Sequence, residues 1–448
     1  MNQNLLLGAK DRPQTSKWIL LSFQHVFAMF GATVLVPMLT GLPISVALFA
    51  SGIGTLIYIL CTQARVPIYL GSSFAYINYI VAASTMTGGG IGAAMTGIVI
   101  VGVIYCVISL IIKFAGTEWL NKLLPPIIIG PMIMVIGLGL AGSAIKNTNL
   151  IIGGDWRAIV VAFATVIVIG YISIKSKGFL KVIPFLIGII FGYLFSIILD
   201  FIPNGAHDLV NLTPIKDVII NPAKWFKLPE FMLLGWKDAE LGAGVQMVKL
   251  NLAAAINVIP LAFATICEHI GDHKVLGKIT GEDYISSPGL HRTLLGDGIA
   301  TAFAGLVGGP ANTSYGENTS VVGLTKIGSV WVTGGAAVIA IALSFFNVFT
   351  TIISTIPSCV MGGICLVLYG FIASNGLKTL FDANVDLTDT RNLIIISVML
   401  IIGIGGAVLS LGANVQFSGM ALTAIIGILL NWILPKEKKA DINIEIEE

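Results

Sequence analysis

Two carboxylates stand in parts of the sequence that are otherwise poor in charge. Glu268 lies within an apolar run that begins near Leu250, and Glu317 lies in residues 308–318, which join two apolar runs. A carboxylate at the centre of a membrane helix costs about 2.5 to 3.5 kcal/mol on insertion scales, so it normally faces an interior cavity and marks a pathway. If the apolar runs cross a membrane, both residues are candidates for a polar site inside it. For Glu268, a helix that stops there and leaves the side chain at the membrane surface is an equal alternative.

Other titratable residues accompany these carboxylates. His25 lies in the first apolar run, and Asp272 follows Glu268 by four residues, which places both acids on one face if the helix continues. None has an evident cationic partner within the membrane, so these groups could bind and pass protons, although a lone histidine is more often structural. His269 and His273 share another face, which we expect to meet cytoplasmic water. With no third ligand in a suitable pattern, they do not indicate a metal site.

The backbone around Glu317 cannot form a regular spanning helix. Pro310 and three glycines interrupt residues 308–318, and unpaired backbone groups in hydrocarbon cost several kcal/mol each unless protein or a water-filled cavity receives them. We therefore expect an extended piece followed by a half-helix, whose N-terminus directs free N–H groups and a partial positive charge toward a site beside Glu317. An ordinary polar loop is the alternative.

Residues 67–75 form a second stretch of this kind. Pro67 and Gly71 favour an extended start, and Ser72 and Ser73 could satisfy the freed backbone groups of a helix that follows. Phe74 could then present its ring to a planar ligand, although an aromatic residue in an apolar segment usually serves only packing.

The composition of this chain indicates that most of it lies in a membrane. Of 448 residues, 56% are hydrophobic and only 11% are charged, and apolar runs long enough to cross a ~30 Å hydrocarbon layer recur along the chain. A bundle of membrane helices follows. The net charge of +2 is distributed in short clusters, so nucleic acid is not an expected partner. The five cysteines lie in apolar segments without CxxC spacing, so they indicate neither disulfides nor a metal site.

The apolar runs predict an all-α polytopic membrane protein with fourteen segments. The polar insertion that starts at residue 201 divides them into two halves of seven, and an odd number per half makes the second half an inverted repeat of the first. The third and tenth segments are short and broken, as expected of discontinuous helices at a midplane site. The segments lie near residues 18–39, 45–62, 70–84, 91–114, 124–144, 157–174, 182–200, 247–271, 294–309, 315–326, 330–352, 357–375, 392–411 and 417–434.

The positive charges predict the orientation of these segments. With both termini in the cytoplasm, most of the 25 lysines and arginines fall in cytoplasmic stretches, as the positive-inside rule requires. The N-terminal apolar run has no clear cleavage site, so we interpret it as a retained first helix and not as a signal peptide.

Several blocks of residues, in the same order, closely resemble bacterial uracil permeases of the nucleobase–ascorbate transporter family. The resemblance covers about residues 12–434, and its blocks are residues 24–25, 27–33, 71–75, 268–271, 288–292 and 312–318. It implies a multi-pass protein of the cytoplasmic (inner) membrane with a core domain, a gate domain, an extracytoplasmic interfacial loop and a cytoplasmic tail. The core would comprise residues 1–122 and 247–353, the gate residues 123–200 and 354–434, the loop residues 201–246 and the tail residues 435–448.

The same resemblance implies roles for individual residues. Glu268 and Glu317 would bind the uracil ring, Phe74 and Tyr315 would line the pocket, and the backbone at Phe74 and Gly316 would form hydrogen bonds with the ligand. Tyr369 would contact the site from the gate side, and His25, Glu268 and Asp272 would couple transport to protons. The implied activity is proton-coupled import of uracil by alternating access, without metal or cofactor, in contact with membrane lipid, and a homodimer is a further expectation.

Uracil itself fits such a site. Its flat, neutral ring offers two N–H donors and two carbonyl acceptors, so a specific pocket needs carboxylate acceptors, backbone N–H donors and an apolar wall. A xanthine or urate carrier of the same family is the main alternative. Glu317, where purine carriers usually have glutamine, favours uracil, whereas Asp272, where some uracil permeases have histidine, is closer to the purine members. Ser320 replaces a glycine often seen in the family.

Two functions outside the family find little support in the sequence. A passive channel would require a filter repeat, which the sequence does not contain. An intramembrane hydrolase could be imagined from Ser72 or Ser73 with His25, but no nucleophile elbow or oxyanion motif accompanies them.

Overall fold

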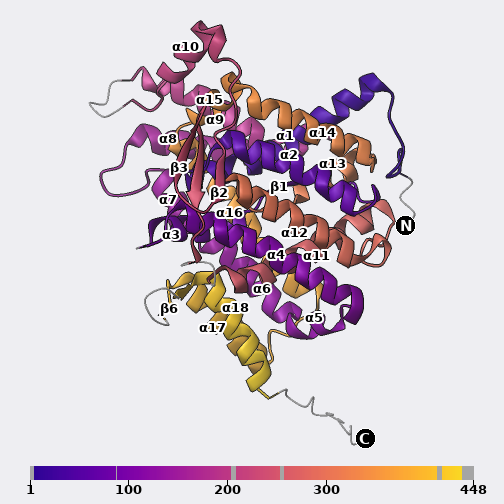
Figure 1. Cartoon of the computed structure of the whole chain (residues 1–448). Helices are drawn as coiled ribbons and strands as arrows, with labels where there is room; N and C mark the ends of the chain where they lie inside the picture. Colours follow the sequence, from indigo (N-terminus) through magenta and orange to yellow (C-terminus); the bar gives the residue numbers. More distant parts are fainter. Residues whose placement is uncertain (1–4, 87, 203–207, 253–256, 411–415, 436–448) are drawn as a thin grey trace, which may run out of the picture.

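The computed structural model describes residues 5–86, 88–202, 208–252, 257–410 and 416–435 (Figure 1). Its helices are α1 (Thr15–Thr40), α2 (Ile44–Cys61), α3 (Ile77–Thr85), α4 (Ile91–Ala115), α5 (Glu118–Leu123), α6 (Pro126–Leu138), α7 (Ala141–Asn147), α8 (Trp156–Lys175), α9 (Pro184–Asp200), α10 (Thr213–Ile220), α11 (Ile259–Thr280), α12 (Leu290–Val307), α13 (Gly316–Thr325), α14 (Val330–Phe345), α15 (Asn347–Ser354), α16 (Ser358–Asp382), α17 (Thr390–Ile404) and α18 (Gly419–Ile433). The short strands are β1 (Leu70–Ser72), β2 (Met232–Gly235), β3 (Ala239–Gly242), β4 (Val245–Lys249), β5 (Asn312–Ser314), β6 (Val408–Ser410) and β7 (Gln416–Ser418).

Many of the helices are suited to a membrane. Six helical stretches of the described chain are long and apolar enough to cross one, and four further apolar helices, α9, α14, α17 and α18, are shorter. Apolar side chains on one face of α8 are exposed at helical spacing, which is the pattern of a helix that faces lipid. They are Trp156, Val160, Phe163, Ile167, Tyr171 and Ile174. The chain is therefore a multi-pass membrane protein.

The helices pack in two groups, each built from both halves of the sequence. In the first group, α12 packs against α4 and α2, and α14 packs against α1 and α2. In the second group, α16 packs against α6 and α8, and α8 packs against α9. The α17 and α18 pair, yellow in Figure 1, lies along one edge of the bundle and contacts α6. Helix α11 contacts α4 of the first group and α6 of the second, and α1 contacts α9, so these contacts join the two groups.

Both broken segments begin extended and continue as helices, which confirms this part of the expected fold. The strand β1 leads through the short helix η1 (Phe74–Tyr76) into α3, and β5 leads into α13. The two strands pair antiparallel, with Leu70 opposite Ser314 and Ser72 opposite Asn312. Because the strands run in opposite directions, α3 and α13 lead away from this ladder in opposite directions. Figure 1 shows β1 near the middle of the bundle, where it contacts α1 and α2.

The eighth segment differs from its expected bounds. Strand β4 occupies residues 245–249 and pairs with β2 and β3 in a small sheet, so that α11 begins at Ile259 and continues to Thr280. The surface position considered for Glu268 is therefore wrong, because the residue lies inside the helix and not at its end. Residues 253–256, which belong to the same predicted segment, and residues 436–448 of the predicted tail lie outside the described part of the chain.

A strap formed by residues 5–12 lies against the turn between α13 and α14. Its backbone exchanges hydrogen bonds with this turn, including Leu6 N–H to Lys326 O at 2.7 Å and Gly328 N–H to Leu7 O at 2.9 Å. The Arg12 guanidinium lies over the rings of Trp18 and Trp331, 5.5 and 5.3 Å from their centroids. The strap therefore secures the end of the half-helix that carries Glu317.

Candidate functional site

The half-helix α13 presents Glu317 at its open end. The residue before the helix, Tyr315, has extended backbone and contributes no side-chain cap, so the first N–H groups of α13 have no partner from that side chain. Gly316 is exposed and Glu317, in the first turn, is partly exposed. An acceptor oxygen of a neutral ligand can therefore approach the N–H groups at this helix end, while a donor can meet the Glu317 carboxylate.

The central part of α11 brings two further carboxylates to the same place. Glu268 and Asp272 lie one turn apart, and the Ser314 hydroxyl of β5 donates to Asp272 Oδ2 at 2.6 Å. Glu268 and Asp272 both lie within electrostatic range of Glu317. Among the ion pairs of the described residues, none joins these three acids to a lysine or arginine. The structure thus gathers three acceptors without a permanent counter-charge.

His25 lies on another side of α13. The Asn318 side-chain amide donates to the backbone carbonyl of His25 at 2.9 Å and lies 3.1 Å from His25 Nδ1. Within the described residues, the hydrogen bonds of the His25 side chain do not reach Glu268 or Asp272. His25 is therefore bonded to Asn318, the residue that follows Glu317.

Hydrogen bonds fix the ring of Tyr315 against the first broken segment. Its hydroxyl donates to Ser72 O at 2.9 Å and accepts from Thr33 Oγ1 at 3.1 Å, and the side chain is buried. A Cβ at Gly71 would lie 2.5 Å from this ring, so only glycine permits such close contact between β1 and Tyr315. With its hydroxyl committed to protein atoms, Tyr315 contributes packing and shape to the site.

Phe74 lies between the two helix groups. It packs against the apolar cluster that contains Tyr315 and also against the cluster that contains Tyr369 of α16. Tyr369 itself is buried. Phe74 thus packs against both the cluster of Tyr369 and the cluster of Tyr315.

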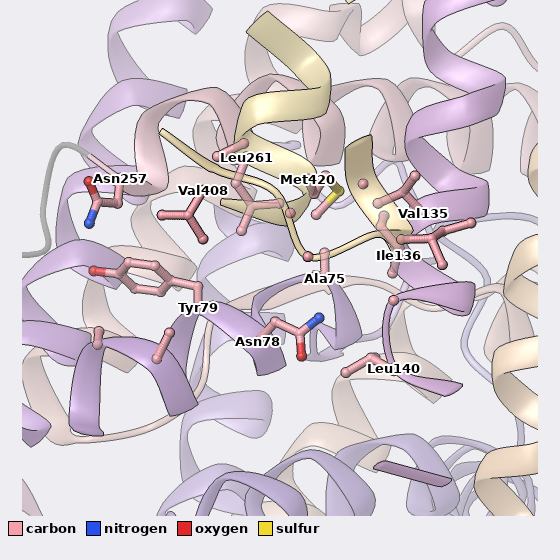
Figure 2. A pocket seen from close by; sticks show the side chains of 18 of the residues that line it. Ala75, Asn78, Tyr79, Val135, Ile136, Leu140, Asn257, Leu261, Val408 and Met420 are labelled. Atoms are coloured by element: carbon pink, nitrogen blue, oxygen red, sulfur yellow. The ribbon is translucent and has the colours of Figure 1, made fainter. Parts of the chain in front are cut away.

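A cavity of about 420 Å³ opens next to Phe74 (Figure 2). Its wall combines α3 with the ends of α6 and α17, the start of α18 and residues that precede or begin α11. Figure 2 shows Asn78, Tyr79 and Asn257 among otherwise apolar labelled side chains. The lining residues are Phe74, Ala75, Asn78, Tyr79, Ala82, Ala83, Met86, Val135, Ile136, Gly139, Leu140, Asn257, Leu261, Gly403, Ile404, Gly406, Val408, Gly419, Met420 and Ala421. The cavity thus lies among α3, α6, α11, α17 and α18 and extends to Phe74.

Comparison with known proteins identifies the family. Residues 16–412 match the model of a permease family, that of the xanthine and uracil permeases. The chain belongs to the xanthine/uracil permease family. Three relatives named uracil permease come from Bacillus caldolyticus (48% identical, over 98% of this chain and 97% of the relative), Bacillus subtilis strain 168 (46%, 97% and 97%) and Escherichia coli strain K12 (39%, 95% and 93%). The resemblance to uracil permeases of the nucleobase–ascorbate transporter family is thereby confirmed, and these relatives are transporters and not enzymes.

Solved transporter structures share the fold of this permease. The transmembrane domain of the cyanobacterial bicarbonate transporter BicA aligns with a TM-score of 0.63 at 15% identity, over 94% of this chain and 98% of that one. SLC26A9 aligns with a TM-score of 0.66 at 11% identity, over 93% of this chain and 64% of that one. At these identities the similarity concerns the fold alone.

The permease contains a buried polar cluster that sequence reasoning missed. His269 and His273 are both fully buried, so the expectation that they meet cytoplasmic water is wrong. His269 instead pairs with Asp297 of α12, and His273 pairs with Tyr58 of α2. Asp297 stands in a predicted membrane segment, so the same insertion-cost argument that selected Glu268 could have found it.

Proposed function

We propose that this permease is a proton-coupled symporter that imports uracil across the cytoplasmic membrane. One observation carries the proposal: Glu268 and Glu317 lie within electrostatic range of each other at the open N-terminus of α13, and Phe74 begins the helical part of the opposing broken segment. The names of the relatives support uracil as the substrate.

Uracil binds through complementary hydrogen bonds. The carboxylates of Glu268 and Glu317 accept from the two ring N–H groups, and the backbone at Gly316 and Phe74 bonds the carbonyl oxygens. The Phe74 ring covers one apolar face, Tyr315 holds the backbone of β1 in place beneath it, and Tyr369 contacts the site from the other helix group. A flat ring without charge suits this arrangement, because acceptors, donors and an apolar wall are all present.

Protons bind to the same group of acids. Three carboxylates without a lysine or arginine repel one another strongly in a medium of low dielectric constant, and a bound proton reduces this repulsion. Glu268 and Asp272 take up the proton, and His25 responds through Asn318 when α13 moves. Proton binding thereby prepares the acids for uracil, and proton release on the cytoplasmic side weakens its binding.

Alternating access follows from the two helix groups. Fourteen membrane segments in two inverted repeats form a core (residues 1–122 and 247–353) and a gate (residues 123–200 and 354–434), with both termini in the cytoplasm. The gate moves against the core while uracil stays at the broken segments, and the cavity beside Phe74 is part of its route. Lipid surrounds the exposed apolar faces, and two copies associate as a homodimer.

A xanthine or urate carrier is the second candidate, because Asp272 stands where some uracil permeases have histidine. Competition of labelled uracil uptake by unlabelled uracil, thymine, cytosine, xanthine and urate distinguishes the two. Saturation by uracil and not by xanthine supports the proposal, whereas stronger competition by xanthine refutes the substrate assignment. Abolition of uptake by a protonophore separates a symporter from a passive channel.

A further inference from the structure

His269 and Asp297 form a buried pair on the side of α11 that adjoins α12. His269 Nδ1 lies 2.9 Å from Asp297 Oδ2, and both side chains are completely or almost completely inaccessible to solvent. His269 Nε2 lies 3.1 Å from the Thr293 hydroxyl, whose proton can point to Leu290 O at 3.1 Å. Both ring nitrogens therefore have an oxygen within reach, which permits a doubly protonated ring as well as a neutral one.

A second pair lies directly behind the first. His273 Nδ1 donates to the backbone carbonyl of His269 at 2.6 Å, and its Nε2 contacts the Tyr58 hydroxyl. The two histidine rings are 4.0 Å apart. Both ring nitrogens of His273 therefore have a partner. Asp297 Oδ1, in contrast, is buried without a hydrogen-bond partner within the described part of the chain.

In the part of the chain that the structure describes, the charged and titratable groups that face Asp297 supply no cation other than His269. Those within electrostatic range are Tyr58 of α2, Tyr76 of η1, Tyr105 of α4, and Glu268 and Asp272 of α11. All of these are neutral or acidic. An isolated carboxylate this deeply buried is strongly unfavourable, so the pair must share a proton, either on the carboxyl group or on the imidazole.

We propose that His269 and Asp297 form a second proton-binding site, which holds a proton behind the uracil site and exchanges it with Glu268 during transport. The inference rests on the proposed function and adds to it a site outside the uracil-binding carboxylates. Glu268 precedes His269 in the chain and lies within electrostatic range of Asp297.

The exchange needs no other reactant. A proton leaves the pair, which changes from neutral overall to one negative charge, and it binds the Glu268 carboxylate, which becomes neutral. The total charge of the three groups stays constant, so the transfer avoids adding charge to the membrane interior. The His273 ring, which contacts the Tyr58 hydroxyl, packs against the His269 imidazole while this occurs.

Reconstituted full-length protein can test this site with two kinds of transport. Labelled uracil exchange without a gradient requires binding and movement, whereas accumulation against a concentration gradient also requires proton coupling. With the exterior more acidic by one unit and the membrane potential clamped at zero, one coupled proton supports about ten-fold accumulation of neutral uracil. For Asp297→Asn we expect accumulation close to one-fold while exchange persists.

Three comparisons make the result decisive. Thr293→Val removes one hydrogen bond of the His269 ring but leaves both groups that can carry the proton, so any loss should affect exchange and accumulation in parallel. Equal loss of both in Asp297→Asn, or ten-fold accumulation that survives, would overturn the inference. His269→Gln keeps a donor for Asp297 and removes the titratable ring of the pair, so if Asp297→Asn does not fold, this variant should in its place reduce accumulation more than exchange, and equal loss of both would overturn the inference. Wild-type protein without accumulation would instead refute the proposed proton coupling itself.

Discussion

Replacing Glu317 by glutamine tests the proposed uracil site most sharply. Glutamine keeps the volume of the side chain and exchanges one acceptor oxygen for an NH₂ group. A hydrogen bond to a charged group contributes about 1.5 to 3 kcal/mol, so uracil affinity should fall roughly ten-fold to more than a hundred-fold. Stability should change less. Glu317 makes no ion pair among the described residues, and a negative charge in the first turn of a helix contributes only about 0.3 to 1 kcal/mol.

Calorimetry of uracil binding to purified Glu317→Gln protein, combined with thermal unfolding without ligand, separates these effects. Glu282→Gln is the matched control, because it makes the same chemical change at an exposed residue beyond the end of α11. An unchanged dissociation constant would remove Glu317 from the site. A large loss of thermal stability with little loss of affinity would assign it a bracing role instead.

Two further substitutions probe the supports of the site. Gly71→Ala places a Cβ 2.5 Å from the Tyr315 ring, and we expect this overpacking to cost about 1 to 3 kcal/mol and to lower the unfolding temperature. Gly142→Ala, at a position with open space, is the control. Equal unfolding temperatures of the two variants would contradict the close contact. Arg12→Ala removes two cation–π contacts of about 0.5 to 1 kcal/mol each at exposed positions, so thermal stability should fall modestly, whereas Arg12→Lys should retain part of it. Identical unfolding of the alanine and wild-type proteins would show that the strap adds no stability.

The broken segments were predictable because their backbone chemistry is local. Pro310 and the neighbouring glycines exclude a continuous helix, and the need to satisfy freed N–H and C=O groups then requires protein contacts. The partner was not predictable in this way. Pairing of β1 with β5 joins residues more than half the chain apart, and the close approach that Gly71 permits depends on the position of Tyr315 in the folded protein.

The ends of α11 and the environment of its histidines were predicted less well. Hydropathy placed the start of this segment near residue 247, because the apolar residues of β4 cannot be distinguished from a helix by composition alone. The spacing of the two histidines shows that they share a helix face, but it does not show what that face contacts. They were assigned to water because their partners, Asp297 and Tyr58, lie on other helices. A buried polar residue depends on such distant partners, and one helix face does not reveal them.

The most direct measurement of the central claim is proton movement driven by uracil. Proteoliposomes that contain the permease are suspended in weakly buffered medium with a pH indicator outside, potassium and valinomycin clamp the membrane potential, and uracil is added to the exterior without any initial pH gradient. A proton–uracil symporter predicts alkalinisation of the medium that requires uracil and saturates with its concentration. At a uracil concentration that half-saturates the wild-type protein, the alkalinisation should be strongly reduced in Glu317→Gln. Uracil entry without alkalinisation would contradict the account.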